Sequence, residues 1–132
     1  MTSAWDVLVV DDEAVVRDGV RLVLEDAGLR VAAAEDLRQG LEFASAHDCR
    51  LVLCDLMLPD GPGFQLVQAL RQLRPDLPVV LITGYPTSEN AVRAIEAGAS
   101  DFLPKPFTES ELLAVVQRAL EPARALPRRS SP

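Results

Sequence analysis

The chain has 132 residues and a mass of 14.3 kDa, the size of one ordinary domain. Hydrophobic residues make up 48% of it, so it can bury a core and is not expected to be disordered. Its net charge of −7 argues against direct nucleic-acid binding, because phosphate backbones need a basic face. We find neither a membrane-spanning run nor a secretory signal, so the sequence predicts a soluble, cytoplasmic domain with no membrane contact.

The composition changes near residue 120. Residues 1–120 hold all the periodic apolar patterns, without internal repeats or low-complexity segments. The last twelve residues, EPARALPRRSSP, are rich in Pro, Arg and Ser and have no apolar periodicity. We therefore predict one domain over 1–120 and a linker or disordered tail over 121–132.

Short apolar runs alternate with amphipathic segments along the first 120 residues. The runs predict strands at 7–10, 31–34, 51–54, 79–82 and 101–103. The segments between and after them predict helices at about 13–27, from Asp36, around Val67–Leu73, at 88–97 and around Leu112–Leu120. Their spacing turns Ala27 and Leu73 toward the core. Five strands alternating with five helices predict an α/β fold with a parallel sheet.

Polar residues follow four of the predicted strands. Asp11 and Asp12 follow the first, Asp55 the third, Thr83 the fourth and Lys105 the fifth. Most have an ordinary explanation alone, because acidic pairs often cap helices and Thr83 and Lys105 suit turns or loops. Asp55 is less ordinary, because it ends an apolar run where an unpaired carboxylate is costly. Parallel strands, however, bring their carboxyl ends to one edge, where ligands of such sheets bind. We therefore expect these side chains to form one site.

Clustered carboxylates repel one another, and a hard divalent cation such as Mg²⁺ relieves that repulsion. A lysine and a threonine hydroxyl opposite such a metal suit phosphoryl oxygens, and a carboxylate can accept a phosphoryl group. The residues alone thus predict Mg²⁺-dependent formation of an aspartyl phosphate. They leave open which aspartate accepts the group, although Asp55 is the most central.

Four motifs resemble those of response-regulator receiver domains in two-component signalling, and the similarity covers about residues 6–120. They are VLVVDDE, DLMLPDGPGF from Asp55, LITG ending at Gly84, and GASDFLPKPF from Gly98 to Phe107. The resemblance implies a flavodoxin-like, doubly wound sheet of five parallel strands in the order 2-1-3-4-5 with five helices. The segment from LITG to KPF is similar to receivers of bacterial transcriptional regulators.

The resemblance also implies a role for each candidate site residue. Asp55 would be the phosphoacceptor and a ligand of Mg²⁺. Asp11 and Asp12 would be acidic residues of the metal site, and the main-chain carbonyl of Met57 a further ligand.

The resemblance implies that Thr83 and Lys105 contact the phosphoryl oxygens. Thr83 and Phe102 would form the switch, where Phe102 replaces the tyrosine that is frequent in the family. The Lys105–Pro106 peptide would be cis, a minority state even before proline.

Other residues near Asp55 are less regular. The loop Asp60-Gly61-Pro62-Gly63 is richer in glycine and proline than is usual in the family, so its path is not predicted. We interpret Cys54 as a small buried residue, with oxidation that modulates the site as the alternative. With only Cys49 and His47 nearby, the cysteines are too few for a zinc site.

The favoured function is a phosphorylation-operated switch. A sensor histidine kinase would be the donor, and phosphorylation would change a surface formed by the fourth helix, fifth strand and last helix, with a homodimer as one outcome. The chain beginning shortly before its first strand suggests an amino-terminal receiver, followed by its own output domain in a transcriptional regulator; a standalone receiver and a receiver of a hybrid kinase are the alternatives. The domain would not be an enzyme, apart from catalysing its own Mg²⁺-dependent phosphorylation and dephosphorylation.

Two other function classes remain open from the sequence. One is an unphosphorylated, receiver-like protein-interaction module. The other is a metal-dependent phosphatase or phosphotransferase, which is disfavoured because Met57 stands where such enzymes usually carry a second aspartate. The resemblance also implies that Met57 and Tyr85 flank the path of a hydrolytic water. The Met57 side chain cannot orient water and the Tyr85 ring can cover the approach, so we expect slow autodephosphorylation.

Overall fold

The computed structural model describes residues 5–121 and places five strands in one parallel sheet. The order is β2-β1-β3-β6-β7, which confirms the expected order 2-1-3-4-5 and the α/β class. The strands are β1 (Trp5–Val10), β2 (Val31–Ala34), β3 (Cys49–Asp55), β6 (Val79–Thr83) and β7 (Asp101–Pro104). The expected tail, apart from residue 121, lies outside the described residues.

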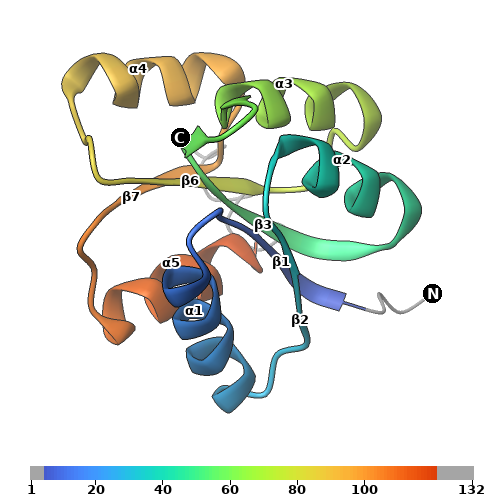
Figure 1. The fold of residues 1–132 in the computed structure, drawn as a ribbon, viewed down its shortest axis with the longest axis vertical. Helices are drawn as coiled ribbons and strands as arrows, with labels where there is room; N and C mark the ends of the chain where they lie inside the picture. The colour runs from blue at the N-terminus through green and yellow to red at the C-terminus, as the bar shows by residue number, and fades with distance from the viewer. Residues whose placement is uncertain (1–4, 122–132) are drawn as a thin grey trace, which may run out of the picture.

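Helices cover both faces of the sheet (Figure 1). On one face lie α1 (Ala14–Asp26) and α5 (Glu109–Ala119); on the other lie α2 (Leu37–Ala46), α3 (Phe64–Leu73) and α4 (Ser88–Ala97). Within the described residues, each helix is too short or too polar to span a bilayer.

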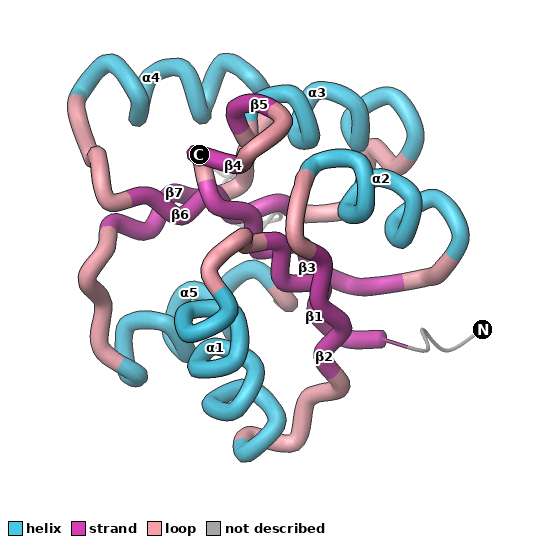
Figure 2. Tube along the Cα trace, viewed as in Figure 1, coloured by secondary structure: helices cyan, strands magenta, loops and turns pink. Residues whose placement is uncertain are grey.

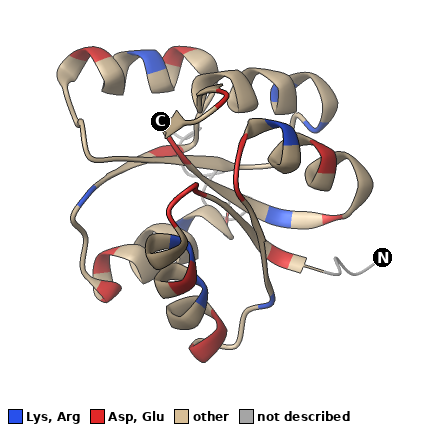
Figure 3. Ribbon diagram, viewed as in Figure 1, with Lys and Arg blue, Asp and Glu red and all other residues tan. Residues whose placement is uncertain are grey.

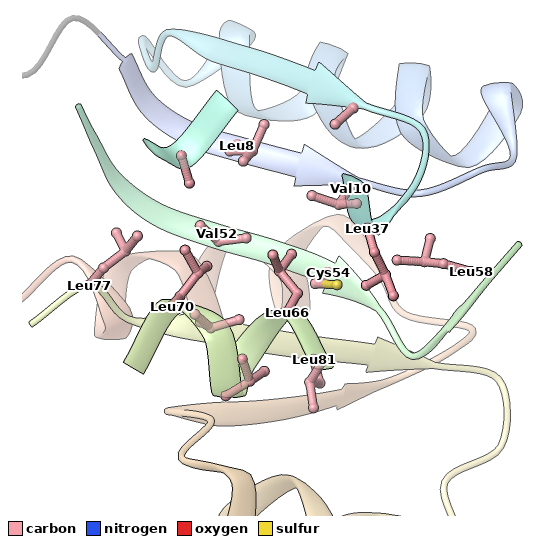
Figure 4. Close-up of a cluster of buried hydrophobic side chains, with 14 of the residues drawn as sticks. Leu8, Val10, Leu37, Val52, Cys54, Leu58, Leu66, Leu70, Leu77 and Leu81 are labelled. Atoms are coloured by element: carbon pink, nitrogen blue, oxygen red, sulfur yellow. The ribbon is translucent and has the colours of Figure 1, made fainter. Parts of the chain in front are cut away.

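The core consists of two apolar layers because side chains alternate between the faces of a strand. Leu8 and Val10 of β1 belong to the layer under α2, α3 and α4, part of which is drawn in Figure 4. Val7 and Val9 belong to the layer under α1 and α5. Both faces are therefore buried, which explains why the strands are continuous apolar runs rather than alternating ones.

Capping side chains set several helix ends. Asp36 accepts a hydrogen bond from the Gln39 N–H at 2.8 Å, as expected for the start of α2. Thr87 begins α4 in the same way. Gly98 ends α4 with a φ of 104°, a left-handed conformation that favours glycine.

The sequence pattern misjudged two helical side chains. Leu73 is 55% exposed, and Leu77 in the following loop is buried in the core instead. Ala27 is exposed because α1 ends one residue earlier, while Leu29 packs against the core beyond it. Both residues lie at a helix end, Leu73 as the last residue of α3 and Ala27 one residue past α1, and a leucine of the following loop packs into the core instead.

A small hairpin follows β3 and was not predicted. It consists of β4 (Met57–Leu58) and β5 (Gly61–Pro62), which pair antiparallel before α3 begins (Figure 2). The glycine- and proline-rich loop after Asp55 therefore has a defined path.

Asp6 lies near the start of β1, at the end of the sheet away from Asp55, and basic groups bind its carboxylate. Its carboxylate accepts hydrogen bonds from the Arg30 N–H at 2.8 Å and from Nη1 of Arg50 at 3.1 Å. Burial acts to raise the pKa of Asp6, but these donors and the two positive charges outweigh it. The pKa of Asp6 therefore lies below its ordinary value.

We expect Asp6→Asn to lower the free energy of unfolding by about 1 kcal/mol near neutral pH, because the amide cannot form the ion pairs. Since the pKa of Asp6 is lower in the folded state, this contribution is present above the unfolded-state pKa and is lost as pH falls through the folded-state pKa. Urea unfolding at a series of pH values measures it, with the exposed Asp26→Asn as control. A deficit that persists in acid would contradict the ion-pair explanation.

Candidate functional site

The carboxyl ends of the central strands bring together the predicted acidic residues. Asp11 and Asp12 follow β1, and Asp55 ends β3. Carboxylate oxygens of these three aspartates all lie within 4.8 Å of one another. Asp11 and Asp55 are buried, whereas Asp12 is exposed. Figure 3 shows acidic segments at these strand ends.

Lys105 reaches this acidic cluster from the loop after β7. Its Nζ lies 3.4 Å from Oδ2 of Asp55, 3.5 Å from Oδ2 of Asp11 and 3.8 Å from Oε1 of Glu13. Lys105 is the only lysine in the sequence. The Lys105–Pro106 peptide is cis, which confirms the expectation from the family resemblance.

The charges at this edge do not balance. Burial raises the pKa of Asp55, the neighbouring Asp11 charge raises it further, and Lys105 offsets only part of this. Burial acts to lower the pKa of Lys105, but Asp55 and Asp11 outweigh it and the pKa lies above its usual value. Lys105 therefore stays protonated, and the buried carboxylates favour additional positive charge.

Main-chain contacts fix the two buried aspartates. The Glu13 N–H donates to Oδ1 of Asp11 at 2.9 Å, and Nη1 of Arg17 donates to the Asp11 carbonyl at 2.7 Å. A Cβ on Gly63 would lie 2.5 Å from the Asp55 carbonyl oxygen, so the close approach requires glycine.

Sequence reasoning assigned no role to Glu13 or Arg17. Glu13 directly follows the acidic pair, which was a usable signal. Arg17 lies in the first turns of α1, where an arginine is an ordinary helix-surface residue. Nothing in the sequence therefore indicated its contact with Asp11.

Thr83 and Phe102 lie on neighbouring strands. Thr83 is fully buried, and its hydroxyl accepts a hydrogen bond from the Tyr85 N–H at 2.9 Å. By strand alternation its side chain lies on the face under α4, where Phe102 also packs. Phe102 is half-buried and lines a cavity of about 160 Å³ together with residues of α4. The structure thus places the two predicted switch residues on one face.

The donor set at the acidic cluster suits Mg²⁺. Asp11, Asp12 and Asp55 supply hard oxygen atoms, which this ion prefers, and Asp12 leaves the site open to water. Met57 follows at the start of β4, and its side chain is 58% exposed. These residues could hold the ion, and the individual roles assigned to Asp55, Thr83, Lys105 and Met57 remain predictions.

The cysteines are buried and free, as predicted for small core residues. Burial raises the pKa of Cys49 to about 11. Burial also raises the pKa of Cys54, and the adjacent Asp55 charge raises it further. Because the thiolate is the reactive form, this environment argues against the oxidation alternative.

Residues 7–117 match the sequence pattern described as the response regulator receiver domain. The chain belongs to this family. This chain is 43% identical to the C4-dicarboxylate transport transcriptional regulatory protein DctD of Pseudomonas aeruginosa. The match extends over 119 residues, which are 89% of this chain and 26% of DctD. The chain thus spans about a quarter of that relative's length.

Solved receiver structures have the same fold. A CheY-like receiver domain protein from Methanospirillum hungatei matches with a TM-score of 0.87 and 31% identity over 93% of this chain and 98% of that one. The beryllofluoride-activated NtrC4 receiver domain dimer matches with a TM-score of 0.85 and 32% identity over 89% of this chain and 97% of that one.

We expect Asp12→Ala to raise the Mg²⁺ concentration that half-saturates the receiver by about tenfold, because it removes one carboxylate from the donor set. Isothermal titration calorimetry measures this. Asp48→Ala is the control, since it removes an exposed carboxylate paired with Arg74 ahead of β3, away from the strands' carboxyl ends. Equal Mg²⁺ affinity in Asp12→Ala and wild type would rule out Asp12 as a ligand.

Proposed function

We propose that this receiver domain accepts a phosphoryl group from a sensor histidine kinase onto Asp55 and thereby controls a transcriptional output. The observation that carries this proposal is the buried Asp55, which shares one ammonium group with Asp11 at the carboxyl edge of a receiver-family sheet. The charge imbalance there favours a ligand that brings positive charge.

The proposed transfer is a displacement at phosphorus. An oxygen of the Asp55 carboxylate forms the new bond to phosphorus while the bond from phosphorus to the donor's histidine nitrogen breaks, and that nitrogen keeps the electron pair. The Lys105 ammonium, 3.4 Å from Asp55, neutralises charge on the phosphoryl oxygens. Held by Asp11, Asp12 and Asp55, Mg²⁺ would supply further positive charge to the same oxygens. The domain acts only on itself and is not an enzyme in the ordinary sense.

We further propose that phosphorylation acts through Thr83 and Phe102. When the Thr83 hydroxyl moves to the phosphoryl group, it leaves its Tyr85 N–H partner and space opens on the face that Phe102 shares. The affected surface would be α4, β7 and α5, where Val92 and Ile95 are exposed. Formation of a homodimer is supported by the beryllofluoride-activated dimer of the related NtrC4 receiver, and its location at this surface is part of the proposal.

The output would lie in another part of a longer protein. DctD, a transcriptional regulator by name, is about four times longer than the segment matched here. The net charge of −7 supports a receiver that does not itself bind nucleic acid. A cytoplasmic location, where it would meet the kinase, is part of the same proposal.

Asp55→Asn is expected to abolish phosphorylation and to preserve the fold, because the amide keeps the shape of the side chain but is not a nucleophile. Intact-mass measurement after incubation with Mg²⁺ and a small phosphodonor tests the loss, and circular dichroism tests the fold. Asp26→Asn is the matched control at the end of α1. Full labelling of Asp55→Asn would refute the assignment, and an unlabelled wild type would favour the unphosphorylated interaction module.

The phosphorylated receiver is expected to lose its phosphoryl group slowly. Met57 and Tyr85 flank the proposed approach of water, and the thioether of Met57 orients water poorly. The Met57→Asn, Tyr85→Glu double variant should decay faster, by about 100-fold if it supplies one general acid–base contact. Mass spectrometry over time in Mg²⁺ buffer compares the two. Slower decay in the double variant would show that these side chains do not shield the site.

A further inference from the structure

Asp60 lies in the turn between β4 and β5, and its carboxylate binds the first turn of α2. Oδ1 accepts a hydrogen bond from the Leu37 N–H at 2.9 Å, and Oδ2 accepts one from the Arg38 N–H at 3.1 Å. The first N–H groups of a helix have no partners within the helix. Asp60 therefore satisfies two of them from a position more than 20 residues away along the chain.

The turn that holds Asp60 is structurally continuous with the phosphoacceptor. In the hairpin, Met57 pairs with Pro62. The Met57 N–H donates to Oδ1 of Asp55 at 3.3 Å, and the Gly63 N–H donates to the Leu56 carbonyl at 2.7 Å. A displacement of the turn would therefore move the main chain that carries the predicted Met57 ligand.

Packing reinforces the link between the hairpin and α2. A Cβ on Gly61 would lie 2.9 Å from Cδ1 of Leu37, and Gly61 has a φ of 146°. Leu37 and Leu58 belong to the same buried cluster (Figure 4). The small burial of Asp60 acts to raise its pKa, but the two α2 N–H donors outweigh it and the pKa is lowered. Asp60 is therefore ionised at neutral pH, as a strong acceptor for both donors.

We propose that Asp60 is a positioning residue for the metal site, joining α2 to the hairpin and thereby holding the Met57 main-chain carbonyl beside Asp55. This inference rests on the proposed function, which puts Mg²⁺ at Asp11, Asp12 and Asp55. Groups that orient metal ligands affect metal affinity without touching the ion. Because coupling between sites is reciprocal, Mg²⁺ binding also stabilises the first turn of α2.

A Mg²⁺ titration of the ¹⁵N-labelled chain, followed by amide NMR, tests the positioning role. In the wild type, the Leu37 and Arg38 amides are expected to shift with the same midpoint as Met57. Asp60→Ala is expected to raise the Met57 midpoint about tenfold and to abolish the α2 response. Asp60→Asn keeps one carbonyl acceptor and is expected to give an intermediate midpoint.

Asp36→Ala is the matched control. It removes the side-chain bond to the Gln39 N–H from the same helix but leaves the hairpin unchanged. Its Mg²⁺ midpoint is expected to equal that of the wild type. A midpoint raised as much as in Asp60→Ala would overturn the proposal, because α2 stability alone would then explain the effect.

Two further outcomes are distinguishable. A wild-type midpoint in Asp60→Ala would also overturn the positioning role while leaving the metal site of the proposed function intact. A wild type in which no amide responds to Mg²⁺ would refute that metal site itself, and the role of Asp60 with it.

Discussion

Two buried carboxylates that share one ammonium group set the chemistry of this domain. Asp11 and Asp55 lie at the ends of adjacent strands, and Lys105 lies 3.5 and 3.4 Å from them. An isolated buried carboxylate is costly, and the raised pKa of Asp55, caused by burial and by Asp11, expresses that cost. The fold tolerates this arrangement because the two apolar layers on the faces of the sheet supply the core.

The parallel topology explains why these groups meet. Each of β1, β3 and β6 is covered on both faces, so polar side chains are accommodated at the strand ends, and the carboxyl ends lie where the chain leaves for the next helix. Residues distant in sequence thus converge without a dedicated binding loop. The contacts of Arg17 and Glu13 with Asp11 then fix the geometry more finely than the strands alone could.

The α/β class and the end of the sheet that carries the site could be predicted from the apolar runs and the polar residues that follow them, whereas the strand order came from the family resemblance. Helix ends were harder: the spacing of Leu73 with Leu70 is helical, yet the core is completed by Leu77 of the loop. The hairpin and the bonds of Asp60 could not be predicted. The hairpin strands have two residues each, too few for a periodic pattern, and the Asp60 bonds join a side chain to main-chain groups far along the chain, which leaves none.

The sequence uses arginine at every basic position except 105. A guanidinium is a wide, planar donor, whereas an ammonium is a compact charge that fits between two carboxylates. This distribution allows the domain to be labelled at one position. A reagent selective for lysine side chains has a single target, Lys105, which lies among the acidic residues at the carboxyl ends of the strands. Because the reactive form of that amine is the neutral one, its modification rate reads how strongly Asp11 and Asp55 hold the proton on Lys105. Any cation that competes for these carboxylates therefore becomes detectable without an introduced probe.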